Sequence, residues 1–258
     1  MKVLNTYSDF NLWRKGLSEQ AISKGVGFVP TMGALHLGHA SLLTKSLNEN
    51  SVTVLSIYVN PTQFNNLEDL KKYPITLAED LELAKNLGVD VVFVPTYEEI
   101  YPDNYKFKVI ENDFSLSLCG ANRPGHFNGV LTVVMKLLNI IQPQRAYFGE
   151  KDFQQLMLIK SMVQAFFMQV EIVACPTMRE KNGLARSSRN TRLSEVDKEK
   201  AAIIYKAIVS NQPIEKIRKC IEDEGFSVEY LVDFLGRRYI AVDVHGVRLI
   251  DNVNITKK

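Results

Sequence analysis

Short apolar runs rich in Val, Ile and Phe alternate with segments of helical period between residues 25 and 175, and no other feature constrains the fold as much. The apolar runs predict buried strands at Val26–Pro30, Val52–Val59, Asp90–Pro95, Arg145–Phe148 and Val170–Pro176. The segments between them carry apolar residues at three- and four-residue spacing, which predicts helices at Ala40–Leu47, Thr76–Leu87, Gly129–Ile141 and Phe153–Phe167. Because such alternation is typical of β-α-β units, we expect an α/β fold whose parallel sheet binds ligands beyond its strand ends.

The pattern changes after Pro176. Ser194, with Asp197 three residues later, predicts the capped start of a helix that runs to about Ser210. A second helix follows Pro213, and short strands separated by glycine turns are predicted at Val228–Leu235, Tyr239–Val244 and Val247–Ile250. We therefore expect one large domain over residues 1–176 and a small α+β domain over residues 177–258.

Charge and composition exclude several classes of partner. The 258 residues include 31 Lys and Arg against 29 Asp and Glu, a formal net charge of only +2. Nonspecific nucleic-acid binding depends on a broad basic surface, so we expect no nucleic-acid partner. No apolar run approaches the roughly 18 to 20 residues of a membrane span, and Met1–Trp13 lacks a signal-peptide core, so we expect a cytoplasmic protein without membrane association. The three cysteines lie far apart without a CxxC pair, which indicates neither a disulfide framework nor a cysteine zinc site.

The most informative motif is GFVPTMGALHLGH, residues 27–39, which follows the first predicted strand and opens a helix. His36 and His39 share one helix face beside backbone N–H groups that lack intrahelical partners, a place that suits a phosphate. Gly33 and Gly38 would allow a nucleotide to approach the backbone closely. The alternative is that the two histidines only cap and pack. Zinc is a weaker option, because the helical metalloprotease motif spaces its histidines four apart, and no P-loop motif occurs.

Two further clusters carry groups suited to phosphates. Tyr147–Gln155 lies at another strand end and offers Lys151 as a cation and Asp152 for a ribose hydroxyl or a metal-bound water. The alternative for this cluster is a solvated helix start with Asp152 as its N-cap. Gly183–Asn190 offers two hydroxyls and two guanidinium groups, although taken alone it is an ordinary loop.

Two more segments offer amides and a histidine. Val59–Phe64 ends the second strand with amide side chains, which suit an uncharged hydroxylated group. Arg123–Phe127, which includes His126, precedes a long apolar helix and alone resembles a turn and cap. Because all these clusters lie at strand ends or in loops of one predicted sheet, a shared ligand site is favoured over independent structural roles. We expect a structural role for His245 in the small domain.

Seven sequence blocks in order make the chain resemble the pantothenate synthetase family, the pantoate–β-alanine ligases. They are PTMGALHxGH, VNPxQF, Tyr73-Pro74 followed by Glu79-Asp80, RPxHFxGV, FGEKDxQQL, PTxRE and SSRN. The likeness runs from Phe28 to Asn190 and resumes at Arg248–Val253. It implies membership of the HIGH-type nucleotidyltransferase superfamily, with Ser187–Arg189 standing in for the flexible KMSKS-like loop. The implied architecture is a Rossmann-like parallel sheet with helices on both faces, which binds ATP and pantoate, plus the small C-terminal α+β domain containing the SSRN loop.

The resemblance implies an ATP-dependent condensation of pantoate with β-alanine. Pantoate carboxylate would attack the α-phosphate of ATP, giving pantoyl adenylate and pyrophosphate, and the amine of β-alanine would displace AMP. His36, His39 and Lys151 would supply donors and positive charge around the α-phosphate. Ser187, Arg189 and Mg²⁺ would hold the leaving pyrophosphate. The family also implies a homodimer.

The resemblance assigns the candidate site residues. The catalytic set comprises His36, His39, Lys151, Ser187 and Arg189. The residues expected to bind ATP are Met32, Gly33, Ala34, Leu35, His36, Leu37, Gly38, His39, Gly149, Glu150, Lys151, Asp152, Met178, Arg186, Ser187, Ser188 and Arg189. Those expected to bind pantoate or β-alanine are Met32, Asn60, Gln63, Tyr73, Arg123, His126 and Gln155. No protein metal site is expected, since Mg²⁺ would arrive as Mg-ATP and lie near Asp80.

Two features and two rival functions qualify this assignment. Arg186 stands where the family usually has Leu or Met, so we expect a more basic loop, and the C-terminal domain looks short. The polar segment Glu180–Asn190 has few apolar groups to anchor it, which predicts a lid that closes on ATP. The rivals are a nucleotidyltransferase with a different acceptor and a catalytically silent nucleotide-binding module. Gln63 and Gln155 argue against the first rival, and the retained phosphate-facing residues argue against the second.

Overall fold

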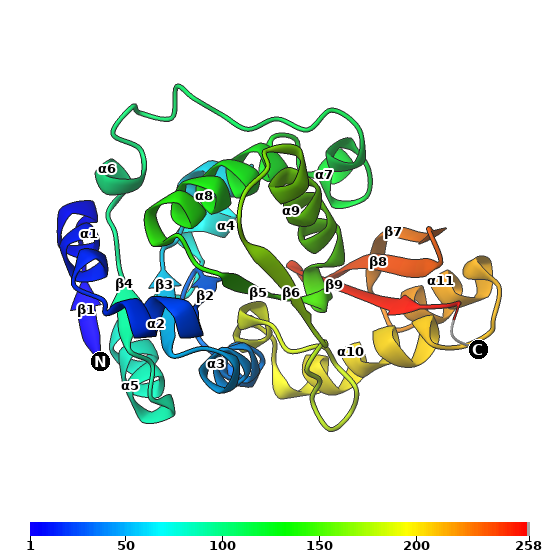
Figure 1. The fold of residues 1–258 in the computed structure, drawn as a ribbon. Coiled ribbons are helices and arrows are strands. Elements are labelled where there is room, and N and C mark those ends of the chain that lie inside the picture. Colours follow the sequence, from blue (N-terminus) through cyan, green and yellow to red (C-terminus); the bar gives the residue numbers. More distant parts are fainter. Residues whose placement is uncertain (257–258) are drawn as a thin grey trace. The chain divides into compact units, whose positions relative to one another are not determined.

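A computed structural model of the protein describes residues 1–256, which form two units (Figure 1). The first unit comprises Met1–Gly149 and Gln154–Cys175. The second comprises Glu150–Phe153 and the chain from Pro176 onward. The boundary expected between residues 176 and 177 therefore lies close to the division along the chain, but the short excursion at Glu150–Phe153 has no counterpart in the sequence-based boundaries.

The first unit contains a six-stranded sheet in the order β1-β4-β3-β2-β5-β6, and every pair of neighbouring strands is parallel. The strands are β1 (Lys2–Leu4), β2 (Val26–Thr31), β3 (Val52–Ile57), β4 (Val91–Phe93), β5 (Arg145–Gly149) and β6 (Glu171–Cys175). From β2 the chain builds outward first through β3 and β4 and later through β5 and β6. The strand order therefore reverses between β2 and β5, and ligands of open α/β sheets bind at the carboxyl ends of strands beside such a switch.

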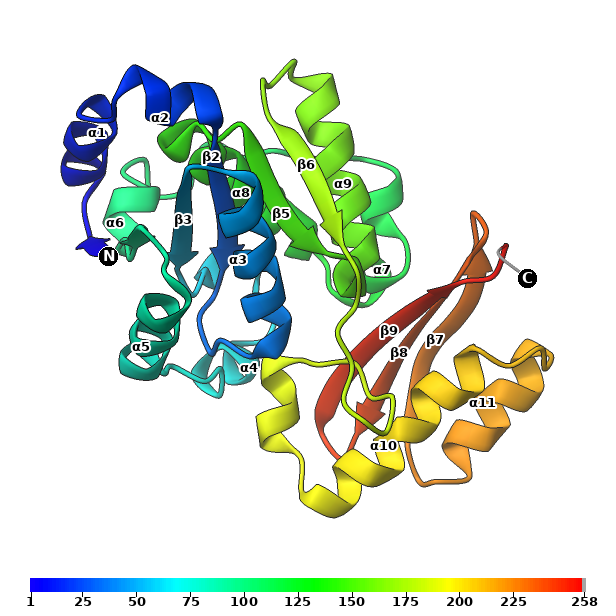
Figure 2. The same ribbon diagram turned by 60° about the horizontal axis from the view of Figure 1, so that its bottom comes forward.

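Helices cover both faces of this sheet, as predicted (Figures 1 and 2). α3 (Leu37–Glu49) and α5 (Leu77–Leu87) lie on one face, and α8 (His126–Ile141) and α9 (Phe153–Ala165) lie on the other. α8 is the most apolar helix, with buried residues on most of its surface, which suits a helix enclosed by the sheet and its neighbours. Shorter helices complete the unit: α1 (Tyr7–Lys15), α2 (Glu19–Lys24), α4 (Leu67–Lys71), α6 (Tyr97–Ile100) and α7 (Cys119–Asn122).

The second unit packs two helices on a three-stranded antiparallel sheet of order β7-β8-β9. Its elements are α10 (Glu195–Ile208), α11 (Ile214–Glu222), β7 (Ser227–Phe234), β8 (Arg237–Val244) and β9 (Val247–Asn254). Its own core contains Leu184, Ile204, Ile217, Ile240 and Val242. The predicted small α+β domain is thus confirmed. Ser194 caps α10 as expected, because its side chain accepts the Asp197 N–H.

One strand was not predicted, and another is longer than predicted. β1 lies in the first 24 residues, outside the predicted alternation, and pairs in parallel with β4. β9 continues four residues beyond the predicted end at Ile250, through Asp251, Asn252, Val253 and Asn254. The extension is largely polar, and its backbone pairs with β8 in an unbroken register. No helix within residues 1–256 has the length and apolar character needed to cross a membrane.

Candidate active site

The loop between β2 and α3 carries the first motif and has an unusual backbone. Gly33 and Ala34 both have positive φ, 78° and 49°. A Cβ at Gly33 would lie 2.8 Å from Oδ2 of Asp80, so this position requires glycine for its conformation and for its space. The Gly33 N–H donates to Oγ1 of Thr31 at 3.2 Å. The loop therefore has a specific shape before α3 begins.

Asp80, in the first turn of α5, holds this loop. Its Oδ2 accepts the Ala34 N–H at 2.9 Å, and its Oδ1 accepts the Leu35 N–H at 2.7 Å. Thr76 also donates to Oδ1 at 3.2 Å, and Asp80 is only 3% exposed. A carboxylate buried on two backbone donors and a hydroxyl does not fit a ligand of Mg²⁺, which needs accessible oxygens. The expectation of Mg²⁺ near Asp80 is thus replaced by a structural role in shaping the loop.

His36 and His39 begin α3 and cap it reciprocally. The Gly38 N–H donates to Nδ1 of His36 at 3.0 Å, and the His36 N–H donates to Nδ1 of His39 at 3.3 Å. The ring centroids lie 4.1 Å apart. Because both Nδ1 atoms are acceptors, each neutral ring carries its proton on Nε2 and is a donor there. Capping and phosphate donation, which the sequence posed as alternatives, use different nitrogens of the same rings and are compatible.

An amide cluster lies at the end of β3. Gln63 donates through Nε2 to the Met32 sulfur at 3.0 Å and accepts at Oε1 from Nδ2 of Asn60 at 3.1 Å. Asn60 is 1% exposed, and its Oδ1 accepts from Tyr101 at 2.9 Å and from Thr62 at 3.0 Å. Burial raises the pKa of Tyr101 above its ordinary value, which keeps the phenol a neutral donor. The Gln63 side chain is thereby held in one orientation.

The RPxHFxGV block supports the backbone of Gln63. Nδ1 of His126 donates to the Gln63 carbonyl at 2.8 Å, while Nε2 of His126 accepts from Nη1 of Arg123 at 3.0 Å. Nη2 of Arg123 reaches the same carbonyl at 3.3 Å. A Cβ at Gly129 would lie 2.4 Å from the Thr62 carbonyl oxygen, which explains the glycine of this block. Because both ring nitrogens of the buried His126 bond to protein, it positions Gln63 and is not expected to bind pantoate directly.

The neighbouring glutamines of α9 have different environments. Gln154 is 5% exposed, accepts the Cys119 N–H at 3.1 Å, and donates to the Phe114 and Ser117 carbonyls at 2.8 and 2.9 Å. It fixes the segment before α7. Gln155, the predicted pantoate residue, is half-buried on the next position of the helix. Tyr73 is buried with its ring edge against Phe64, 5.7 Å between centroids, which places it beside the amide cluster.

In the second unit, one small pocket brings together two of the predicted catalytic residues. Lys151 and Ser187 line it with Leu184, Ala185, Ile204, Leu249, Ile250 and Asp251. Lys151 and Asp152 lie in a 3-10 turn, Glu150–Asp152, and their side chains form an ion pair at 3.5 Å. Ser187 begins the 3-10 turn Ser188–Arg192, where its hydroxyl accepts the Arg189 N–H at 3.2 Å. A cation and a hydroxyl in one pocket are groups that suit a phosphate oxygen.

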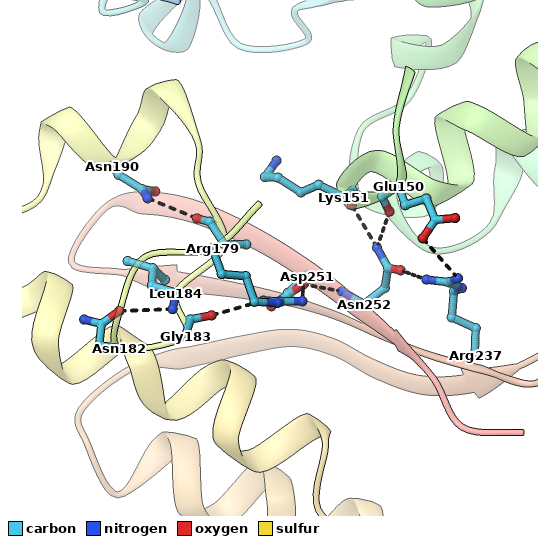
Figure 3. A network of polar contacts seen from close by, with 11 residues as sticks. Glu150, Lys151, Arg179, Asn182, Gly183, Leu184, Asn190, Arg237, Asp251 and Asn252 are labelled. Atoms are coloured by element: carbon cyan, nitrogen blue, oxygen red, sulfur yellow. Dashed lines mark hydrogen bonds and ion pairs between the residues drawn. The ribbon is translucent and has the colours of Figure 1, made fainter. Parts of the chain in front are cut away.

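The segment expected to be a lid, Glu180–Asn190, has two buried anchors. Leu184 and Ala185 are 4% and 5% exposed, and Leu184 belongs to the core of the unit. Arg179 pairs with Ala185 across a short bridge, and the Asn190 side chain donates to the Ala185 carbonyl at 3.0 Å (Figure 3). The few apolar side chains of Glu180–Asn190, Leu184 and Ala185, are thus both buried, so this part of the segment is anchored, and its closure on ATP stays a prediction.

The remaining predicted residues lie in loops, at element ends or at the surface. Arg186 forms an ion pair with Glu180, 2.8 Å between Nη2 and Oε2, so its charge is balanced inside the loop. Met178 and Leu37 are exposed, and Gly149 ends β5. His245 bonds to Asp197 at 2.9 Å and packs its ring edge on Phe226, as a structural residue would. Across residues 1–256, no group of three or more His, Cys, Asp or Glu is arranged to hold a metal ion.

Two residues important to these sites, Arg179 and Asn252, had no assigned role at the sequence level, and Asp80 was assigned a different one. Each of the three lies within a block that matches the family, Glu79-Asp80, PTxRE and Arg248–Val253. Membership of a family-matching block was therefore the sequence signal that could have found these residues. Their partners became evident only in the structure, since the Asp80 carboxylate and its backbone donors are 45 and 46 residues apart in sequence.

Comparison with known proteins agrees with these observations. The sequence model of the family described as "Pantoate-beta-alanine ligase" matches residues 2–254. A pantothenate synthetase from Bdellovibrio bacteriovorus is 52% identical over 98% of this chain and 99% of its own length. One from Legionella pneumophila (strain Lens) is 50% identical over 96% of this chain and 99% of its own.

Solved structures give the same result for the fold. A Francisella tularensis pantoate-beta-alanine ligase, complexed with "Beta-gamma ATP and Beta-alanine", is similar at a TM-score of 0.94 and 41% identity, covering 100% of this chain and 99% of that one. A pantothenate synthetase from Thermus thermophilus has a TM-score of 0.88 and 38% identity, with 99% of both chains covered. The first motif of the family forms a glycine loop bonded to Asp80 and a capped histidine pair. Because the family model and the relatives also match nearly the whole chain, this protein belongs to the pantoate-beta-alanine ligase family and is a ligase.

Proposed function

We propose that this ligase condenses pantoate with β-alanine through a pantoyl adenylate and releases AMP and pyrophosphate. The observation that carries the proposal is the histidine pair, whose Nδ1 atoms both accept backbone N–H groups and whose Nε2–H groups are thereby oriented as donors. Oriented donors of this kind stabilise charge that develops in a transition state. The names of the relatives supply the substrates pantoate and β-alanine, and the Francisella complex supplies ATP.

In the proposed first step, a carboxylate oxygen of pantoate forms a bond to the α-phosphorus of ATP. The bond from that phosphorus to the oxygen bridging the β-phosphate breaks, and pyrophosphate leaves with the electron pair. In the second step, the amine of β-alanine attacks the acyl carbon, the bond to AMP breaks, and the nitrogen loses a proton. Adenylation is needed because a carboxylate resists amines whereas AMP is a good leaving group. Neither step uses a nucleophilic side chain.

Each group of the proposed reaction is assigned to one of the sequence motifs. The Nε2–H donors of His36 and His39 are assigned to the α-phosphate, and the amides of Gln63 and Gln155 to the hydroxyls of pantoate. Lys151, which shares a pocket with Ser187, is assigned to phosphate oxygens. An anion attacking a polyanion requires such positive charge and donors around the phosphorus.

The nucleotide is proposed to contact residues of the FGEKD, PTxRE and SSRN blocks. Ser187 and Arg189 would bind the pyrophosphate portion, and Asp152 would accept from a ribose hydroxyl. Backbone at Gly149 and Met178 would lie along the adenosine. We propose Mg²⁺ as part of the Mg-ATP substrate, without Asp80 as a ligand. We propose a homodimer from the family resemblance, and light scattering of the purified protein tests it. A cytoplasmic location and a division into domains over residues 1–176 and 177–258 remain proposals from the sequence pattern.

The proposed reaction is tested by following AMP and pyrophosphate with pantoate and β-alanine added separately and together. We expect ATP–pyrophosphate exchange with pantoate alone and net AMP release only when both substrates are present. AMP release with β-alanine alone, or exchange that needs a different carboxylate, would favour another nucleotidyltransferase activity. No nucleotide turnover with any combination would favour a silent binding module.

Gln155→Leu is expected to raise the KM for pantoate about tenfold to a hundredfold, because a buried substrate hydroxyl left unpaired costs about 1–3 kcal/mol. The KM for ATP should change little. Steady-state kinetics with each substrate varied in turn measures both constants. Gln154→Leu is the matched control, since it removes the bonds to Cys119, Phe114 and Ser117 and should lower the melting temperature while leaving the pantoate KM near wild type. Equal effects of Gln155→Leu on both KM values would contradict the assignment.

Arg186→Leu is expected to raise the KM for ATP less than about threefold, because a partly exposed ion pair is worth about 0–1 kcal/mol. The change leaves the Glu180 carboxylate uncompensated, so the rise should be larger at low ionic strength. The double variant Arg186→Leu/Glu180→Gln removes both charges and should return the KM toward wild type. A rise above tenfold that the double variant does not reverse would instead indicate direct contact between Arg186 and ATP.

A further inference from the structure

Asp251 and Asn252 are adjacent buried polar residues near the end of β9, 5% and 4% exposed. Successive side chains of a strand point to opposite faces of the sheet, so the two residues contact different parts of the unit. Figure 3 shows their contacts: Asn252 reaches the turn that carries Lys151, and Asp251 reaches the segment that leads to Ser187. Neither residue has a role in the reaction proposed above.

Asn252 holds the turn through two backbone carbonyls. Its Nδ2 donates to the Glu150 carbonyl at 2.9 Å and to the Lys151 carbonyl at 2.8 Å. Its Oδ1 accepts from Nη1 of Arg237. The two donated bonds require an amide, because a carboxylate has no N–H and a hydroxyl has only one donor hydrogen.

The turn that Asn252 holds is short. Glu150–Asp152 is a single 3-10 turn, and such short turns depend on outside partners for their conformation. Arg237 adds a second support, with its guanidinium 3.7 Å from the Phe153 ring centroid and 3.8 Å from the Glu150 carboxylate. The direction in which the Lys151 side chain leaves the backbone therefore depends on Asn252 and its neighbour in the sheet.

Asp251 holds the other segment. It pairs bidentately with Arg179, 2.5 Å from Oδ2 to Nη1 and 2.9 Å from Oδ1 to Nη2. Nη1 of Arg179 also donates to the Gly183 carbonyl at 3.1 Å, and its guanidinium stacks 3.7 Å from the Tyr205 ring centroid. Bidentate pairs of this type fix geometry as well as supplying energy. Residues 179–185, which precede Ser187, are thus tied to the same strand as Lys151.

We infer that Asp251 and Asn252 are positioning residues that hold Lys151 and Ser187 at one preformed phosphate pocket. The inference rests on the proposed function for its ligand, the phosphates of ATP. The pocket that contains Lys151 and Ser187 is also lined by Asp251, which places the support directly beside the groups it orients. The pair acts through the backbone of its neighbours and does not itself bind the phosphate.

The decisive variant is Asn252→Asp, which keeps the size of the side chain and the acceptor for Arg237. It replaces the Nδ2 donor with a carboxylate oxygen, which repels the carbonyl oxygens of Glu150 and Lys151. We expect the kcat of adenylate formation in the full-length enzyme to fall about tenfold to a hundredfold, as small misplacements of catalytic groups do. The KM for pantoate should stay within twofold of wild type, because no predicted pantoate residue lies in this network. Amide hydrogen exchange of residues 150–153 should become faster.

The matched control is Asn254→Asp, the same chemical change two residues along β9. The Oδ1 of Asn254 only accepts, from the backbone and hydroxyl of Thr256, and aspartate keeps both bonds. This variant should behave as wild type in kcat, in KM and in exchange. Wild-type kcat in Asn252→Asp, unchanged exchange at 150–153, or an equal rise in the pantoate KM would each overturn the inference.

A second variant covers the case in which Asn252→Asp does not fold. Asp251→Asn removes the charge that pairs with Arg179 and should raise the KM for ATP and speed exchange at residues 179–186. Unchanged exchange there would also refute the positioning role. The exchange comparisons require no turnover, so they decide the inference even if the wild-type enzyme makes no AMP, a result that would refute the proposed function alone.

Discussion

Replacing His39 with alanine is expected to lower the rate of adenylate formation by about 10²–10³, the usual effect of removing one preorganised transition-state donor. The Nδ1 of His39 accepts the His36 N–H at 3.3 Å, which leaves Nε2–H as the oriented donor of the ring. Pantoate-dependent ATP–pyrophosphate exchange measures the rate, and the KM for pantoate should change much less than kcat. His36→Ala should act in the same direction, with an added loss of the bond from Gly38.

Two further substitutions separate the capping nitrogen from the donor nitrogen. His39→Asn retains an acceptor near the position of Nδ1 but has no group at Nε2, so it should keep the wild-type melting temperature and lose as much activity as alanine. His39→Gln places an amide N–H near Nε2 and should retain more activity than asparagine. If His39→Asn were as active as wild type, the histidine would serve only as a helix cap and its catalytic assignment would be wrong.

Asp80→Ala is expected to lower the free energy of unfolding by roughly 3 kcal/mol, because it leaves two buried backbone donors unsatisfied at about 1–3 kcal/mol each. Those donors are the N–H groups of Ala34 and Leu35, directly before the histidine pair. Turnover should fall as well, since the loop would lose the conformation that leads into α3. Urea unfolding in the absence of metal and nucleotide measures the first effect, and AMP release measures the second.

The neighbouring residue supplies the control for Asp80. Glu79 is an exposed carboxylate in the same first turn of α5, so Glu79→Ala should change stability by less than about 0.5 kcal/mol. A metal-free Asp80→Ala protein with the wild-type unfolding midpoint, and with a raised Mg²⁺ requirement, would restore the role of Asp80 as a metal ligand. The expected result is the reverse, with stability lost whether or not Mg²⁺ is present.

Much of the architecture follows from local pattern. Runs such as Val52–Ile57 are buried along their whole length, and continuous apolar strands of this kind occur only where both faces of a sheet are covered. The cap at Ser194 depends on residues within one helical turn and was predicted. The strand β1 was missed, because three residues that pair at a sheet edge carry too little pattern to be distinguished from a loop.

Candidate site residues could be named from the motifs, but the contacts of each side chain could not. Gln154 and Gln155 are adjacent and chemically identical, yet the first bonds to Cys119 and the turn before it while the second lies on another side of α9. Neighbouring positions of a helix point about 100° apart, so one residue can be structural and the next can face a ligand. Sequence alone does not determine which of the two is which.

The sequence by itself determined the α/β class, the alternation of strands and helices between residues 25 and 175, and the motifs that place the chain in its family, because those features depend on periodicity and on residue types within short segments. Only the tertiary structure decided that Asp80 shapes the loop before His36, that His126 supports Gln63, and that Asn252 holds the turn at Lys151. Each of these depends on a directional hydrogen bond between residues 46 or more positions apart. Such a bond forms only when the fold has brought its donor and acceptor together within about 3 Å, and no local pattern encodes that distance.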